Sequence, residues 1–205
     1  MELFVRALVS LFIILGPFGN IFIFESILDS LAVFDKKERE NAIKKAFKVA
    51  YLVWIPVFLF GTYVLKFFGI TIESFEIAGG ILLLLIALDI LQNTAPKISN
   101  VHHHEQELEK VVITPMAIPL LTGPGTITTT ILYRSHINDL KTLSILFISF
   151  SLAYLLAYFV VLKGEEIITR FGRTVVIIAN RLMGLILLAI AVEFITNGIK
   201  LIFFT

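Results

Sequence analysis

Two glycine-proline breaks interrupt apolar stretches of this sequence, and two acidic residues lie in equally apolar surroundings. The breaks are residues 16–20 and 122–126, and the acids are Asp89 and Glu193. Proline lacks a backbone donor and glycine adopts conformations closed to other residues, so a helix is expected to open at each break. Opened backbone inside a membrane survives only where it is buried in protein or lines a wet cavity. These residue types predict the binding of a small polar solute.

Each break is expected to create the N-terminus of a half-helix, at about Gly19-Asn20 and at about Gly125-Thr126. Free N–H groups and the positive dipole end favour an anion there. The carbonyls before each break would accept hydrogen bonds from an ammonium group. A small zwitterion would therefore suit both the half-helix N-termini and these carbonyls. The carbonyls expected to be free are those of Leu15, Gly16, Thr122 and Gly123. The predicted substrate-binding residues are Gly16, Pro17, Phe18, Gly19, Asn20, Thr122, Gly123, Pro124, Gly125 and Thr126.

A simple packing kink is the alternative at each break, because glycine and proline are common in membrane helices. Two breaks in corresponding positions favour a binding site. Asp89 and Glu193 are predicted to bind a proton or another coupling cation, since an ionisable group inside a bilayer is a functional candidate by default. The alternative for these acids is that they reach the headgroup region and are only solvated.

Membrane-spanning helices must position these residues. Hydrophobic residues make up 58% of the 205 positions, charged residues 16%, and the mean hydropathy is +0.93. An average soluble domain is about 45–50% apolar and about 25% charged. A helix crosses a bilayer with about 20 apolar residues. Six spans are predicted, at about 4–30, 46–67, 74–93, 112–133, 141–163 and 175–200.

The six spans form two related halves, residues 1–93 and 112–205, joined by a linker loop at 94–111. Residues 80–89 and 184–193 match in register, with glycine, alanine and the acid coinciding. Because each half has an odd number of spans, the second enters the bilayer from the opposite side. The predicted fold is therefore an all-α integral membrane protein of two inverted three-helix repeats, with helices 1 and 4 discontinuous at the breaks. This architecture is characteristic of secondary transporters.

The distribution of basic residues predicts the orientation of the chain in the membrane. Six spans put both termini on one side, and most of the 17 Lys and Arg residues fall on the other side, which includes the linker. Cytoplasmic loops carry the Lys/Arg excess. Both termini are therefore predicted to be extracytoplasmic, in a multi-pass protein of the plasma membrane.

Several other functions lack the residues that they need. There is no cysteine, and a net charge of +1 gives no general attraction for nucleic acid. The run His102-His103-His104 suggests a metal, but neighbours in sequence point apart and no partner ligand is visible, so neither a metal nor another cofactor is predicted. No nucleotide-binding P-loop is present. An intramembrane enzyme would need a nucleophile and a base at depth, and the histidines lie in loops or at a span end, so no enzyme is predicted.

With these motifs the chain resembles the MarC family of integral membrane proteins over nearly its whole length. The resemblance is carried by residues 16–20, 78–89, 118–125 and 183–185. It implies six spans in an inverted three-plus-three fold and uptake of glycine or alanine, as in an archaeal transporter of this family. Two departures are Phe22, where members often carry proline, and Glu193, where glutamine is common; the second bears on the coupling chemistry.

The sequence therefore predicts a secondary active transporter of small neutral amino acids, such as glycine and alanine, working by alternating access. Its expected partners are the substrate, the lipid bilayer, and H⁺ or Na⁺ as coupling ion. A channel or exporter for another small solute is the first alternative, and an intramembrane enzyme the second. Substrate rank order, transport direction and oligomeric state are left open.

Overall fold

The structure of this protein, a computed structural model, consists mainly of helices. It describes residues 2–31, 33–92, 112–137 and 139–203. No strand occurs in these ranges. The elements are α1 (Glu2–Leu15), α2 (Pro17–Ser30), α3 (Lys36–Phe67), α4 (Ile72–Gln92), the π-helix η1 (Val112–Leu121), α6 (Pro124–Ser135), α7 (Leu140–Leu162), α8 (Gly164–Phe171) and α9 (Arg173–Phe203). The predicted all-α class is confirmed for these residues, and the linker 94–111 with its three histidines lies outside them.

Five helical segments of the described chain are long and apolar enough to cross a membrane. They are Glu2–Asp29, which joins α1 and most of α2, and the helices α3, α4, α7 and α9. The chain is therefore a multi-pass membrane protein. The remaining predicted span, 112–133, consists of two pieces, because η1 has 10 residues and α6 has 12. Each piece alone is shorter than the roughly 20 residues that a crossing needs.

Capping residues decide where two of the long helices begin. The Asp35 side chain accepts a hydrogen bond from the Glu38 N–H (3.0 Å), so α3 begins at Lys36. The predicted span at about 46 marks only the apolar part of this helix, and the preceding basic segment continues as its first turns. The Asp139 side chain caps α7 in the same way through the Thr142 N–H (2.9 Å).

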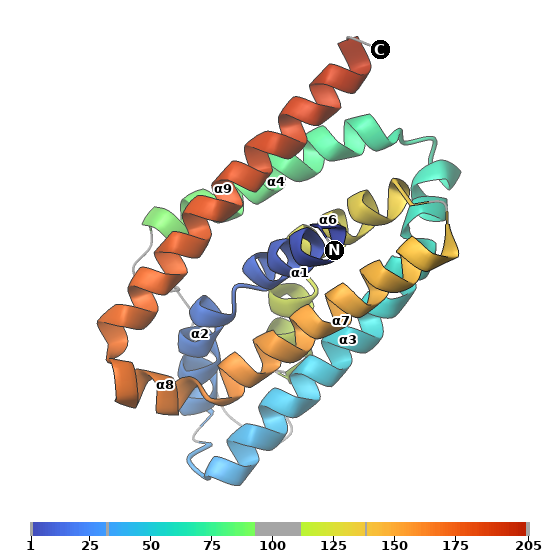
Figure 1. Cartoon of the computed structure of the whole chain (residues 1–205). Coiled ribbons are helices and arrows are strands. Elements are labelled where there is room, and N and C mark those ends of the chain that lie inside the picture. The colour runs from blue at the N-terminus through green and yellow to red at the C-terminus, as the bar shows by residue number, and fades with distance from the viewer. Residues whose placement is uncertain (1, 32, 93–111, 138, 204–205) are drawn as a thin grey trace.

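Two antiparallel helix pairs flank the broken helices, as Figure 1 shows. Aromatic rings join α3 and α7, with Trp54 and Phe150 centroids 6.1 Å apart and Phe58 and Phe147 centroids 5.3 Å apart. Close approach at glycine joins α4 and α9, since a Cβ at Gly80 would lie 2.8 Å from the Ala191 carbonyl oxygen. Small residues allow this approach between membrane helices.

The broken helices pack across the two halves of the chain. Both α1 and α2 pack on α7, whereas η1 and α6 pack on α3. α6 also contacts α4, and α1 and α2 also contact α9. The first segment of each half is therefore placed between helices of the other half.

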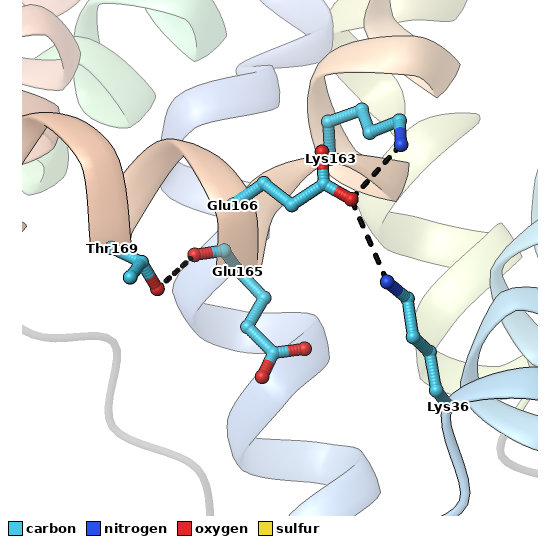
Figure 2. Close-up of polar contacts among 5 residues, drawn as sticks. All are labelled: Lys36, Lys163, Glu165, Glu166 and Thr169. Carbon is cyan, nitrogen blue, oxygen red and sulfur yellow. Dashed lines mark hydrogen bonds and ion pairs between the residues drawn. The ribbon is translucent and has the colours of Figure 1, made fainter.

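A short helix, α8, joins α7 to α9 where the sequence predicted a loop. The Glu166 carboxylate at its start lies 3.0 Å from the Lys163 ammonium and 3.6 Å from the Lys36 ammonium, as drawn in Figure 2. These ion pairs connect the start of α8 to the start of α3. The helix ends at Phe171 and is followed by Gly172, whose φ of 85° favours glycine.

Candidate functional site

The first helix breaks at the predicted motif. α1 ends at Leu15, Gly16 has a left-handed φ of 55°, and α2 begins at Pro17. Glycine is the residue that adopts this conformation without strain, and proline suits the first helical position because no N–H is needed there. The new half-helix therefore starts at Pro17, two residues before the Gly19-Asn20 position that the sequence suggested.

The second break has a different backbone. η1 ends at Leu121, and α6 begins at Pro124 after the non-helical residues Thr122 and Gly123. Gly123 is extended, with φ −84° and ψ 179°. Proline again occupies the start of the new helix. This start precedes the predicted Gly125-Thr126 position by one residue.

One polar side chain bridges each break. Asn20 Nδ2 donates to the Leu15 carbonyl (2.7 Å), and Thr126 Oγ1 donates to the Leu121 carbonyl (3.0 Å). Both side chains are buried, and both reach back five residues to the last turn of the preceding helix. A buried carbonyl left without a donor would cost about 1–3 kcal/mol. The bridges therefore stabilise the opened backbone.

Hydrogen bonds within the chain correct the expectation that the carbonyls before the breaks are free. The carbonyl of Leu15 accepts the Asn20 amide, that of Gly16 accepts the Asn20 N–H (2.9 Å), and that of Gly123 accepts the Ile127 N–H (3.0 Å). The prediction that these three carbonyls are free is therefore wrong. The chain itself satisfies them, and a ligand would have to use their second lone pairs.

A cavity of about 230 Å³ opens beside the first break and is called the smaller cavity below. Its glycine and polar lining residues are Gly16, Gly19, Asn20, Asp89, Asn180 and Arg181. The remaining lining side chains are apolar and include Leu120 of η1. Because the first turn of α2 forms part of the wall, the positive end of that helix dipole lies at the cavity. Pro17 and Phe18 do not line it.

The predicted residues of the second break lie elsewhere. Thr122 Oγ1 donates to the Ala50 carbonyl (2.8 Å), and with Pro124 it lines a mostly apolar hollow of about 540 Å³. Gly125 packs where an added Cβ would meet Leu83 at 3.0 Å and Ile14 at 3.3 Å. Gly123, Gly125 and Thr126 line neither of these spaces. The two sets of predicted substrate-binding residues do not share one cavity in this structure.

A second cavity, of about 910 Å³, is called the larger cavity below. Among its lining residues are Arg6, Ser10, Glu76, Tyr133, His136 and Glu193. The Ser10 and Tyr133 hydroxyls are 2.9 Å apart and link α1 to α6. Asp89 and Glu193, the two predicted ion-coupling acids, therefore line different cavities.

Glu76 and His136 are polar residues of the larger cavity that the sequence reasoning missed. Only 4% of Glu76 is exposed, and its Oε1 lies 3.9 Å from His136 Nε2. Its Oε2 has no hydrogen-bond partner among the described residues. One signal could have found it: in the register that aligns Gly80 with Gly184, Glu76 aligns with Asn180, another polar residue in an apolar helix.

An apolar cluster forms part of the wall of both cavities. Its buried members are Ile13, Leu83, Ala87, Leu187 and Ala191. Ile14, Ile86 and Ile90 pack on this cluster and line the smaller cavity, whereas Ile190 and Phe194 pack on it and line the larger one. Residues that pack on this one cluster therefore line both cavities.

Comparison with known proteins finds relatives over the whole chain. The model described as MarC family integral membrane protein matches residues 1–203. A UPF0056 membrane protein of Methanocaldococcus jannaschii is 37% identical over 204 residues, covering 98% of this chain and 97% of the relative. UPF0056 membrane proteins of Pyrococcus horikoshii and Escherichia coli are 36% and 32% identical, covering 93% and 95% of this chain and 90% and 91% of the relatives. No solved structure matches. The relatives are named as membrane proteins and not as enzymes.

Proposed function

Because the chain belongs to the MarC family of integral membrane proteins, we propose that it is a secondary active transporter of small neutral amino acids such as glycine and alanine. It works by alternating access and is coupled to H⁺ or Na⁺. The observation that carries this proposal is the smaller cavity, where the helix opened at Gly16 lies beside the acidic Asp89 of α4 and the basic Arg181 of α9.

The lining of the smaller cavity suits a zwitterion. The N-terminus of α2 and the Arg181 guanidinium favour a carboxylate, and the Asp89 carboxylate favours an ammonium group. At about 230 Å³ the cavity is below the roughly 300–1,000 Å³ of pockets for drug-sized ligands. The size therefore favours glycine or alanine over amino acids with long side chains.

Helix contacts support the inverted three-plus-three repeat. α4 and α9 are antiparallel: a Cβ on Gly80 would meet Ile195, and a Cβ on Gly184 would meet Ile90 and Leu91. In the register that aligns Gly80 with Gly184, Leu91 corresponds to Ile195. The two glycine contacts are therefore equivalent: exchanging the two halves of the chain converts one into the other. A two-fold axis in the membrane plane would produce this equivalence.

The two cavities support alternating access. Several of their lining residues correspond in the same register, namely Ile86 with Ile190, Asp89 with Glu193, Ile90 with Phe194, and Asn180 with Glu76. Related halves that each form a cavity on one side of a barrier can exchange roles when one half rocks against the other. The barrier in this case is the apolar cluster around Leu83 and Leu187.

The positive-inside rule supports the orientation. With both termini outside the cytoplasm of a plasma-membrane protein, the larger cavity, lined by Arg6 and Lys200 near the chain ends, opens to the outer side. The smaller cavity, lined by Asp89 near the linker, then opens to the cytoplasmic side.

Uptake of labelled glycine into proteoliposomes tests the function. Asn180→Ala is expected to weaken wild-type uptake about tenfold, as loss of a hydrogen bond to a charged group would. Asn41→Ala makes the same change on an exposed turn of α3 and should leave uptake unchanged. An imposed proton gradient and an imposed sodium gradient, used separately, identify the ion. Glycine uptake no higher than in protein-free vesicles under either gradient would remove the glycine assignment.

Saturable exchange between trapped and added glycine separates a transporter from a channel, because a channel conducts without such exchange. The acids are tested separately. The pH dependence of uptake should change in Asp89→Asn and in Glu193→Gln, and an unchanged profile in both variants would contradict their coupling role.

A further inference from the structure

We propose that Glu76 is the residue that binds the transported proton, and that His136 passes the proton to it from the solution in the larger cavity. The inference rests on the proposed transport function, for which it names both the ion and its site. Neither residue belongs to the acids that the sequence singled out.

The burial of Glu76 makes it unsuited to remain a permanent anion. Glu76 lines the cavity, but its side chain is only 5% exposed. Its Oε2 is buried and has no hydrogen-bond partner among the described residues. An ionised carboxylate out of water is strongly destabilised unless its lone pairs are satisfied. Binding a proton removes the charge and gives this carboxyl a donor of its own.

The tautomer of His136 leaves one ring nitrogen available to Glu76. His136 Nδ1 lies 2.9 Å from the Leu132 carbonyl oxygen, which can only accept, so this nitrogen carries a proton in the neutral ring. Nε2 is then an acceptor, and it lies 3.9 Å from Glu76 Oε1. A small rotation of the imidazole brings these atoms into hydrogen-bond distance, as often happens when a site binds its ligand.

The pair also connects a buried site to water. The His136 side chain is 58% exposed and lines the same cavity as Glu76. A proton from water binds His136 Nε2, then moves to Glu76 Oε1, and the ring returns to its neutral form. One N–H bond breaks as one O–H bond forms, so no other reactant is needed.

The surrounding charges favour a proton over a sodium ion. A sodium ion would need several oxygen ligands. The ion-pair partner of Glu76 is instead an imidazole, 3.9 Å away, which repels a cation once it is protonated. The other titratable or charged groups that line the cavity or lie on adjoining turns are Glu73 on α4, Tyr133 on α6, Glu193 and Lys200 on α9, and Arg6 on α1, which is paired with Glu2. Both signs are present among these groups, and none of them forms a hydrogen bond with Glu76 Oε2.

The first experiment compares wild type, Glu76→Gln and Glu73→Gln in proteoliposomes. Glycine exchange at equal pH on both sides tests transport alone, and accumulation driven by a proton gradient tests coupling. Glu76→Gln should keep exchange and lose proton-driven accumulation by about tenfold or more. Glu73→Gln, one turn away on the same helix, should keep both. Full accumulation in Glu76→Gln would overturn the inference.

The second experiment detects the proton directly and does not depend on transport. Infrared spectra of purified protein, recorded against pH, should contain a protonated-carboxyl band in wild type and in Glu73→Gln that is missing from Glu76→Gln. The same band in all three proteins would overturn the inference. If wild type exchanges no glycine, the proposed function fails, and the infrared result alone decides whether Glu76 binds a proton. If wild type exchanges glycine but Glu76→Gln does not, the proposed function stands, and the infrared result decides whether Glu76 binds a proton.

Discussion

Asn20 and Thr126 show how single residues make an opened membrane helix possible. Each donates a side-chain hydrogen bond to a carbonyl five residues earlier, in the last turn before a break. Leu15 and Leu121, which carry these two carbonyls, are both buried, so a donor from the chain itself is needed. The glycine and proline open the helix, and the polar side chain satisfies the carbonyl that the opening exposes.

Removing either bridge should destabilise the fold. Asn20→Ala and Thr126→Val are each expected to lower the free energy of unfolding by about 1–3 kcal/mol, because a buried carbonyl loses its donor. Denaturant unfolding in detergent measures the change. Thr169→Val is the matched control, since Thr169 Oγ1 donates to the Glu165 carbonyl (2.8 Å) on exposed α8, as drawn in Figure 2. It should change stability by less than about 0.5 kcal/mol, and equal losses at buried and exposed positions would contradict this account.

At the scale of elements, the α4 and α9 pair depends on glycines that face backbone. A Cβ on Gly80 would lie 2.8 Å from the Ala191 carbonyl oxygen and 3.0 Å from the Ile195 nitrogen. Backbone cannot move aside as a flexible side chain can. The pair therefore has little tolerance for a larger residue at this position.

Gly80→Ala should accordingly separate the two helices. Overpacking of this kind costs about 1–3 kcal/mol, which thermal unfolding in detergent would register as a lower midpoint. Leu85→Val, on an exposed part of the same helix, should alter the midpoint little. A Gly80→Ala variant as stable as wild type would show that α4 and α9 are free to shift apart.

The cap of α7 should make stability depend on pH. Hydrogen bonds from Thr142, from its side chain first and its N–H second, lower the pKa of the exposed Asp139 carboxyl below the ordinary value of 3.8. The folded state therefore binds this proton less readily than the unfolded state. The stabilisation is present above the ordinary pKa and is lost as the pH falls through the folded one.

Asp139→Asn tests this cap. Asparagine caps helices about as well as aspartate, so stability near neutral pH should change little. Between pH 5 and pH 3, however, the variant should lose less stability than wild type, as measured by thermal unfolding. A parallel decline of both proteins with acid would assign the pH dependence to other groups.

Sequence patterns predicted elements better than contacts between them. The helix breaks followed from glycine and proline, whose backbone limits are local properties. The early start of α3 and the presence of α8 were missed, because hydropathy marks where lipid begins and not where a helix begins. The cap at Asp35 carries the helical signal instead.

At the scale of the whole molecule, the candidate site could be predicted only in part. Gly16, Gly19, Asn20 and Asp89 share a cavity, whereas Thr122 and Pro124 border another space. Which residues meet depends on how α1, α2 and α9 pack, and no local pattern encodes that. Glu76 aligns with Asn180 in the repeat register, but its burial depends on how α6 and α9 pack on α4.

The arrangement of the two cavities predicts that each is accessible from a different side of the membrane. The chain contains no cysteine, so a single introduced thiol can be labelled without background. Val9 lines the larger cavity and Ile23 the smaller one. The proposed mechanism opens these cavities to opposite sides of the membrane. Val9→Cys should therefore react with a membrane-impermeant thiol reagent from one side of the membrane, and Ile23→Cys from the other.

Glycine should then change the two labelling rates in opposite directions. A ligand that binds one conformation more tightly shifts the population toward it, so opening on one side accompanies closing on the other. The expected result is a lower rate at one cysteine and a higher rate at the other, each measured in sealed vesicles of known orientation. Wild type, which contains no cysteine, serves as the unlabelled background. Equal changes in both labelling rates would indicate a pore open to both sides. Alternating access instead requires that one rate rises when the other falls.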